Sequence, residues 1–203
     1  MYPVGAPQPI AEVSMMSGRP EPTNEAYAMA KIATASLADV YRRQYGDDYV
    51  TVIPTNLYGP GDNFDPLMSH VIPALMRRMI EARDTAAPDV EIWGSGTPRR
   101  EFMFVDDAAD AIVFALENYS SDQPLNVGVG KDVSIRELAE TVAAVVEYRG
   151  ALTFDTSKPD GAPRRMLDSS RLAALGWHAR TTLADGLQRM YRWYSNNRAV
   201  VAA

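Results

Sequence analysis

Tyr27 and Lys31 form the pair whose residue types and spacing point most directly to chemistry. They are four positions apart, so on a helix both side chains lie on one face. A lysine ammonium beside a phenol stabilises the phenolate, and such a tyrosine donates a proton to a carbonyl oxygen while hydride reaches the carbon. The same spacing also occurs in ordinary surface pairs, so the spacing alone leaves both interpretations open.

Five further residues have a chemical interpretation beside an ordinary one. His70 stands just before a predicted helix, where it is either an N-terminal capping or packing residue or an acid–base group that works near neutral pH. Arg78, Arg100 and Arg165 are either solvated surface charge or diphosphate ligands, because a guanidinium binds two oxygens at once. Trp93 is either a core residue or a surface along which a nucleotide packs.

Composition excludes several classes of protein and site. The 203 residues include no cysteine, which excludes disulfides and thiolate ligands. The only two histidines are far apart in the sequence and lack the spacing of zinc ligands. A net charge of −6 argues against nucleic acid or an anionic membrane as the main partner. No apolar run is long enough to span a bilayer, and the first residues do not resemble a secretory signal. We therefore expect a cytoplasmic protein.

Helices and strands are predicted to alternate along the chain. The central prediction is a helix from Thr23 or Asn24 to Gly46, then a buried strand at Tyr49–Pro54 and a turn through residues 56–61. Such alternation indicates an α/β architecture with mostly parallel strands. Further helices are predicted at Val71–Arg83, Asp106 or Asp107 to Asn118, Ser134–Tyr148, Ser169–Leu175 and Thr182–Asn196, and further strands at Val90–Trp93, Glu101–Val105, Leu125–Val129 and Ala151–Phe154.

Several motifs, in the right order over nearly all of residues 1–196, resemble the GDP-L-fucose synthase family of the extended short-chain dehydrogenase/reductases. The resemblance implies a Rossmann-like, mostly parallel sheet without its first βα units, plus a small α/β C-terminal substrate lobe. Residues 1–64 would be the remnant of the NADP-binding domain, and residues 65–203 mainly the substrate-binding lobe. The motifs are Tyr27–Lys31, Pro54–Phe64, Ser69–Leu75, Trp93–Phe102 and Lys158–Arg164.

The same resemblance implies an activity and a role for each candidate residue. Members convert GDP-4-keto-6-deoxy-D-mannose to GDP-L-fucose by 3,5-epimerisation and NADP-dependent 4-reduction. Tyr27 would protonate the ketone oxygen, Lys31 would tune Tyr27 and hold the nicotinamide ribose, and His70 would be the general acid of epimerisation. The cofactor positions implied are Tyr27, Lys31, Pro54, Asn56, Leu57 and His70, and the GDP-sugar positions are Arg78, Trp93, Arg100 and Arg165.

The sequence also departs from the family pattern. Met1-Tyr2-Pro3 matches the middle of a family motif whose serine and base cysteine would precede Met1, and none of the Gly-x-Gly turns extends to a dinucleotide fingerprint. Arg165 stands where the family often has lysine. We expect the isolated chain to be poorly stable or associated, whereas the full-length family is homodimeric. The alternatives are a non-catalytic remnant or nucleotide-sugar binding module, or a related nucleotide-sugar epimerase or reductase.

Overall fold

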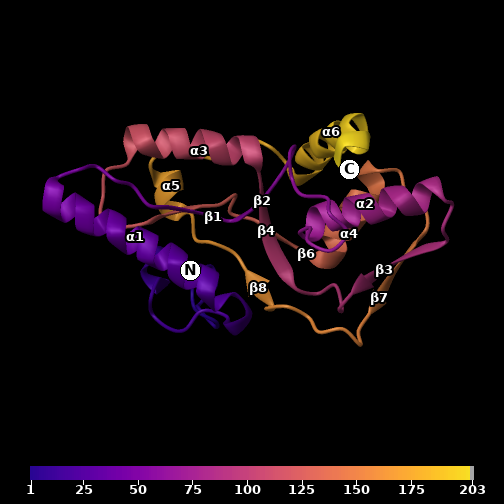
Figure 1. Cartoon of the computed structure of the whole chain (residues 1–203), viewed down its shortest axis with the longest axis horizontal. Helices are drawn as coiled ribbons and strands as arrows, with labels where there is room; N and C mark the ends of the chain where they lie inside the picture. Colours follow the sequence, from indigo (N-terminus) through magenta and orange to yellow (C-terminus); the bar gives the residue numbers. More distant parts are fainter. Residues whose placement is uncertain (202–203) are drawn as a thin grey trace.

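The computed structural model describes residues 1–201 as helices wrapped around short, mostly parallel strands (Figure 1). The helices are η1 (Glu12–Ser14), η2 (Pro22–Asn24), α1 (Glu25–Tyr45), α2 (Val71–Asp84), α3 (Val105–Asn118), α4 (Ile135–Val145), α5 (Ser170–Ala174) and α6 (Leu183–Val201). The strands are β1 (Val52–Pro54), β2 (Asn56–Tyr58), β3 (Asp89–Trp93), β4 (Arg99–Phe104), β5 (Leu125–Val127), β6 (Asp132–Ser134), β7 (Ala151–Asp155) and β8 (Arg164–Arg165).

Parallel pairing dominates these strands. β1 pairs with β5, β2 with β4, β3 with β7 and β8 with β4, all in parallel, and β6 alone among the named strands runs antiparallel, against β4. Thr55 separates β1 from β2, and its N–H donates to the Val127 carbonyl at 3.0 Å. The extended segment made of β1, Thr55 and β2 therefore pairs first with β5 and then with β4. The expected α/β class is confirmed.

Strand β4 lies between two hydrophobic cores. Phe102 and Phe104 face a core built with α2, α4 and α6, whereas Met103 faces a second core with α3, β5 and α5. Successive side chains of a strand point to opposite faces, so three consecutive apolar residues serve both cores. The division of the chain at residue 64 into two domains stays a prediction.

Helix α1 matches its prediction closely. Ala28, Ile32 and Ala35 are its buried residues, at a spacing that places them on one face. Gly46 ends the helix with φ of 76°, a left-handed conformation that glycine adopts without steric cost. The narrow buried stripe leaves most of α1, including Tyr27 and Lys31, at the surface.

Three local predictions were wrong in detail. The strand predicted from Tyr49 begins only at Val52, and the segment predicted as a turn after Pro54 starts with strand β2. β2 exists because it pairs with β4, a distant contact that local residue types do not indicate. Neither Asp106 nor Asp107 caps α3, because that helix follows Phe104 and begins at Val105.

The predicted capping box is confirmed. The Ser134 hydroxyl accepts the Glu137 N–H at 3.1 Å, and the Glu137 carboxylate accepts the Ser134 N–H at 2.7 Å. This reciprocal pair satisfies two backbone donors at the start of α4.

Within residues 1–201, no helix is long and apolar enough to cross a membrane, and no cluster of three or more His, Cys, Asp or Glu side chains is arranged to hold a metal ion.

Candidate active site

The Tyr27–Lys31 pair lies on the solvent-exposed face of α1. Ala28 and Ile32 turn into the molecule, so the two polar side chains project outward. Tyr27 is 60% exposed, and the Lys31 Nζ lies 5.6 Å from the centre of the Tyr27 ring. A phenol that is accessible to a ligand and held beside a positive charge is suited to proton donation.

The extended segment Pro54–Leu57 is exposed at Pro54, Asn56 and Leu57, the three positions predicted to line a cofactor pocket. The side-chain amide of Asn56 donates to the carbonyl of Glu101 at 2.8 Å, and the Thr55 hydroxyl donates to the same oxygen at 3.1 Å. These bonds fasten the segment to β4, one residue away from Arg100.

Glu101 has a structural role at this site that the sequence did not reveal. Its side chain is fully buried, at 0% exposure, and Oε1 accepts the N–H groups of Val129 at 2.7 Å and Gly130 at 2.9 Å. Oε2 accepts the N–H of Leu167 at 2.9 Å. Gly128 has to be glycine here, since a Cβ would lie 2.6 Å from Oε1. One carboxylate thus joins β4, the turn after β5 and the segment that follows Arg165.

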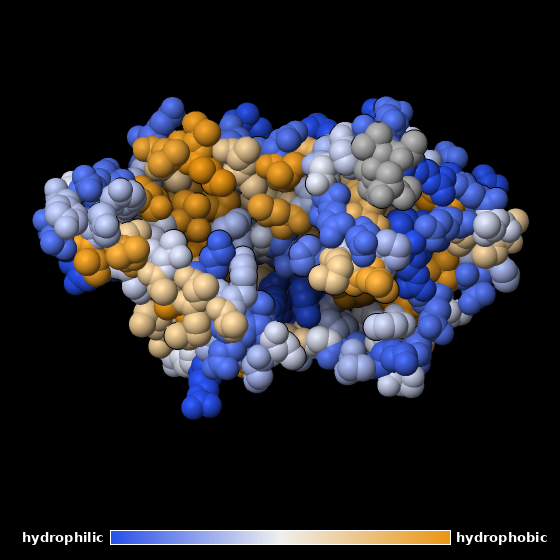
Figure 2. All heavy atoms as spheres, viewed as in Figure 1, coloured by the Kyte–Doolittle hydropathy of each residue, from blue (hydrophilic) through white to orange (hydrophobic). Residues whose placement is uncertain are grey.

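Arg100 and Arg165 are brought together by strand pairing, since they are opposite each other in β4 and β8. Arg100 is half-buried and donates to the carbonyl of Ala162 at 2.6 Å, while Arg165 pairs with Glu21. Burial, and then the neighbouring charge of Arg165, lower the pKa of Arg100. Figure 2 shows a hydrophilic hollow beside β8. Two adjacent guanidinium groups at a hollow are an arrangement that favours a polyanionic ligand.

Arg99 and Arg164, the residues next to this pair, belong to a second group of charges, which stabilises the fold. Arg99 and Arg164 also lie opposite each other, and both donate to the buried carboxylate of Asp132. Burial disfavours the charged carboxylate, but the hydrogen bonds from Arg164 and Arg99 outweigh it and lower the pKa of Asp132. Successive side chains of a strand point to opposite faces, so Arg99 stabilises the fold while Arg100 lies on the other face of β4.

Trp93 is the last residue of β3, and Arg78 on α2 contacts the same strand. The Trp93 ring is 68% exposed, which excludes the core interpretation, and the Lys158 Nζ is 5.6 Å from its centre. Arg78 donates to the carbonyl of Glu91 at 2.5 Å. An exposed indole at a strand end offers a flat surface to a base.

His70 occupies the N-cap position of α2, but its side chain makes no capping bond and is exposed. The capping interpretation of this residue is therefore wrong. Within residues 1–201, no hydrogen bond joins His70 to Tyr27 or Lys31. The roles that the resemblance implies require Tyr27, Lys31, Asn56 and His70 to converge on one cleft, and this convergence stays a prediction.

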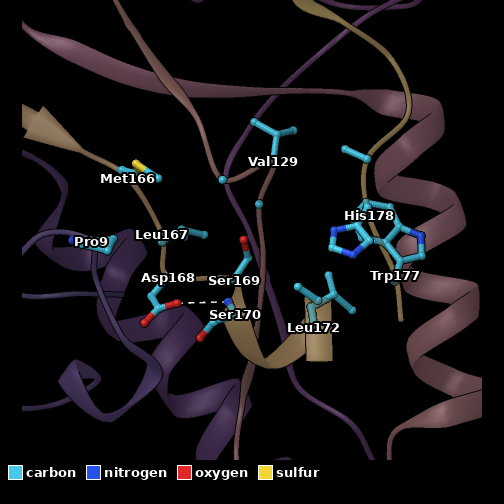
Figure 3. A pocket seen from close by; sticks show the side chains of 14 residues that line it. Pro9, Val129, Met166, Leu167, Asp168, Ser169, Ser170, Leu172, Trp177 and His178 are labelled. Carbon is cyan, nitrogen blue, oxygen red and sulfur yellow. Dashed lines mark hydrogen bonds between the residues drawn. The ribbon is translucent and has the colours of Figure 1, made fainter. Parts of the chain in front are cut away.

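A cavity of about 370 Å³ lies elsewhere, between the Gly128–Gly130 turn, residues 166–173 and residues 177–179 (Figure 3). His178 lies on one side of it and the Ser169 hydroxyl points into it, while Asp168 turns to the Ser170 N–H. None of the ten predicted site residues lines this cavity.

Sequence comparisons show to which family and to which known proteins this chain is related. The model of the NAD dependent epimerase/dehydratase family matches residues 1–130. The chain is 53% identical to GDP-L-fucose synthase 1 of Arabidopsis thaliana over 197 residues, covering 97% of this chain and 61% of the relative. It is 53% identical to the Escherichia coli GDP-L-fucose synthase over 206 residues, covering 97% and 64%. The chain thus spans less than two thirds of the length of these relatives.

The fold is similar to solved structures as well. A GDP-L-fucose synthetase from Naegleria fowleri bound to NADP superposes with a TM-score of 0.92 at 30% identity, covering 98% of this chain and 64% of that one. A GDP-6-OMe-4-keto-L-xylo-heptose reductase from C. jejuni gives a TM-score of 0.89 at 32% identity, covering 97% and 68%.

Proposed function

Because this chain belongs to the NAD dependent epimerase/dehydratase family, we propose that it acts in the NADP-dependent conversion of GDP-4-keto-6-deoxy-D-mannose to GDP-L-fucose. The observation that carries the proposal is the exposed Tyr27 with the Lys31 ammonium beside its ring. The 53% identity to synthases of that name supports the choice of substrate.

In the epimerisation, His70 is the acid. The 4-keto group acidifies the C–H bonds at C3 and C5, so a base removes a proton from one face and leaves an enolate. The exposed imidazole of His70, which no capping bond restrains, returns a proton to the opposite face. Each carbon thus loses one proton to the base and gains another from His70 on the opposite face, so its configuration is inverted.

In the reduction, Tyr27 supplies the proton for the ketone oxygen, and Lys31 stabilises the phenolate that remains. NADPH, when bound, supplies the hydride that adds to C4. The residues present fit this cofactor: Pro54, Asn56 and Leu57 are exposed, and the bond from Asn56 to Glu101 holds their segment in place. A charged Lys31 beside Tyr27 is a suitable partner for ribose hydroxyls.

The substrate lobe holds the GDP portion in this proposal. Arg100 and Arg165 bind the diphosphate, which replaces Glu21 as the partner of Arg165. Arg78 adds a third guanidinium, and the exposed Trp93 packs along the nucleotide. Residues 65–203 would then be mainly the substrate lobe, as the resemblance implies.

We further propose a cytoplasmic homodimer. Exposed apolar side chains support it, because a surface of this kind is stabilised when another subunit covers it. Figure 2 shows such side chains gathered over α3. The exposed residues are Met29, Leu37 and Val40 on α1, and Ile112, Val113 and Leu116 on α3.

A chimera tests the activity. The segment of the E. coli relative that precedes the aligned region is joined to residue 1 and supplies the serine and cysteine that the resemblance requires. We expect this chimera to oxidise NADPH with the keto-sugar and to incorporate solvent deuterium at C3 and C5, and the 203-residue chain alone to do neither. GDP binding without either reaction in the chimera would instead support the binding-module alternative.

A further inference from the structure

Glu21 and Arg165 form an ion pair at the proposed diphosphate site. Their side chains are 40% and 47% exposed, so solvent and ligands reach both. Within residues 1–201, the Glu21 carboxylate is the only acceptor that the guanidinium of Arg165 contacts. Carboxylate and phosphate oxygens are both anionic acceptors for the same guanidinium N–H groups. Glu21 therefore occupies the place at Arg165 that a phosphate oxygen needs.

The two partners of this ion pair are held in different ways. The backbone that follows Arg165 is fixed by the N-terminal segment of the chain. The N–H of Met166 donates to the Gln8 side chain at 2.9 Å, and the carbonyl of Met166 accepts the N–H of Ile10 at 2.8 Å. Glu21, by contrast, reaches strand β8 only through its carboxylate. Arg165 therefore stays in place in its strand when Glu21 leaves it.

The charge of Glu21 also acts on Arg100, which lies opposite Arg165. Burial and the neighbouring charge of Arg165 lower the pKa of Arg100, and the negative charge of Glu21 opposes them. Glu21 thus offsets part of the positive charge that attracts a diphosphate to the two arginines.

Glu21 is also close to Tyr27 in the chain. It is the N-cap of η2, and its carbonyl accepts the N–H of Asn24 at 3.0 Å. Helix α1 follows η2 directly, and Tyr27 lies in its first turn. The ion pair therefore restrains the segment that leads into the helix of the proposed proton donor.

We propose that Glu21 is an internal competitor of the diphosphate: it occupies Arg165 while the site is empty, and a bound diphosphate displaces it and so releases the segment that leads into α1. This inference rests on the proposed function, because it takes Arg100 and Arg165 as the diphosphate ligands. Exposed ion pairs are weak, so Glu21 lowers the affinity for the diphosphate and does not block the site.

Isothermal titration calorimetry of the 203-residue chain with GDP and with inorganic pyrophosphate tests the competition. The variant is Glu21→Gln, which keeps the size of the side chain and removes its charge. Its matched control is Glu25→Gln, because Glu25 is exposed at the start of α1 and makes no ion pair within residues 1–201.

We expect Glu21→Gln to bind both anions about threefold or more tightly than the parent, because no ion pair has to be broken. The gain should shrink at high salt, which screens exposed charges. Glu25→Gln should change either affinity less. Equal affinities of the two variants, or weaker binding by Glu21→Gln, would overturn the proposal.

The gain should also depend on Arg165. When Arg165→Ala is already present, Glu21→Gln should improve binding less than it does in the parent, since there is no ion pair left to break. An equal gain in both backgrounds would mean that Glu21 acts only as a nearby charge, and the proposed competition for Arg165 would be wrong.

Nuclear magnetic resonance of the backbone amides tests the release of the segment. GDP added to the parent should move the signals of residues 23–28 towards their positions in ligand-free Glu21→Gln. GDP added to Glu21→Gln should move the same signals less, because the segment is already released. Equal movements in parent and variant would contradict the coupling between the diphosphate site and α1.

The chimera separates this inference from the proposed function, since binding is measured without catalysis. Tighter binding by Glu21→Gln together with an inactive chimera would reject the function and keep the role of Glu21. An active chimera together with equal affinities of Glu21→Gln and Glu25→Gln would reject the role of Glu21 and leave the function standing. If neither anion binds to the parent or to Glu21→Gln, the inference is wrong as well.

Discussion

Arg165 lies directly opposite Arg100 in the parallel pairing of β4 with β8, and a hydrophilic hollow lies beside β8 (Figure 2). Like charges near each other repel, and Glu21, which pairs with Arg165, offsets part of this repulsion. A diphosphate would neutralise both charges, so we expect this pair to bind the diphosphate of the substrate.

Arg100→Ala and Arg165→Ala should each weaken GDP binding by about tenfold or more, because each removes a charge-assisted contact to phosphate. Isothermal titration calorimetry with GDP and the 203-residue chain measures this. Arg43→Ala on α1, where Arg43 pairs with Asp39, is the control and should bind as the parent does. Affinities that do not differ between the three variants would place the diphosphate elsewhere.

Tyr27→Phe in the chimera should abolish NADPH oxidation while sparing deuterium incorporation at C3 and C5. The phenolic proton is needed only in the reduction, and a lost acid typically costs about 10²–10⁴-fold in rate. Tyr45→Phe is the matched control, since Tyr45 is another exposed tyrosine of the same helix. Loss of both reactions in Tyr27→Phe would mean that this residue also serves the epimerisation.

Glu101→Gln should lower the free energy of unfolding by about 2 kcal/mol. The amide that replaces one carboxylate oxygen carries N–H groups, so it confronts a backbone donor of Val129 or Leu167 and leaves it unpaired. Urea denaturation of the 203-residue chain measures the change, with Glu91→Gln on the exposed face of β3 as control. Equal stabilities of the two variants would show that these buried bonds contribute little.

Asp132→Asn should destabilise the chain at neutral pH by about 1–2 kcal/mol, a modest figure because Arg164 is partly exposed and solvent screens the pair. Folding lowers the pKa of Asp132 below its unfolded value of about 3.9, so the carboxylate contributes stability above that pH. The contribution is lost as the pH falls through the lower, folded value. Denaturation midpoints of parent and variant should therefore converge below about pH 4, and a constant difference down to pH 2 would contradict this account.

Short-range features of this protein followed from the sequence alone. The α/β class, the helix that carries Tyr27 and Lys31, its end at Gly46 and the Ser134–Glu137 capping box all depend on residues within a few positions of one another. Helix periodicity, left-handed glycines and capping side chains act over one turn, so neighbouring residues decide them.

The tertiary structure decided which polar residues pair and which remain free. Strand β2 forms only against β4, and the same pairing scheme brings Arg165 to Arg100. In the sequence Glu101 looks like one more surface charge, yet three backbone donors from distant segments surround it. Asp62 is likewise an ordinary turn residue until burial leaves one of its oxygens without a partner. Desolvation and long-range strand pairing depend on segments far apart in the chain, so no local pattern of residues encodes them.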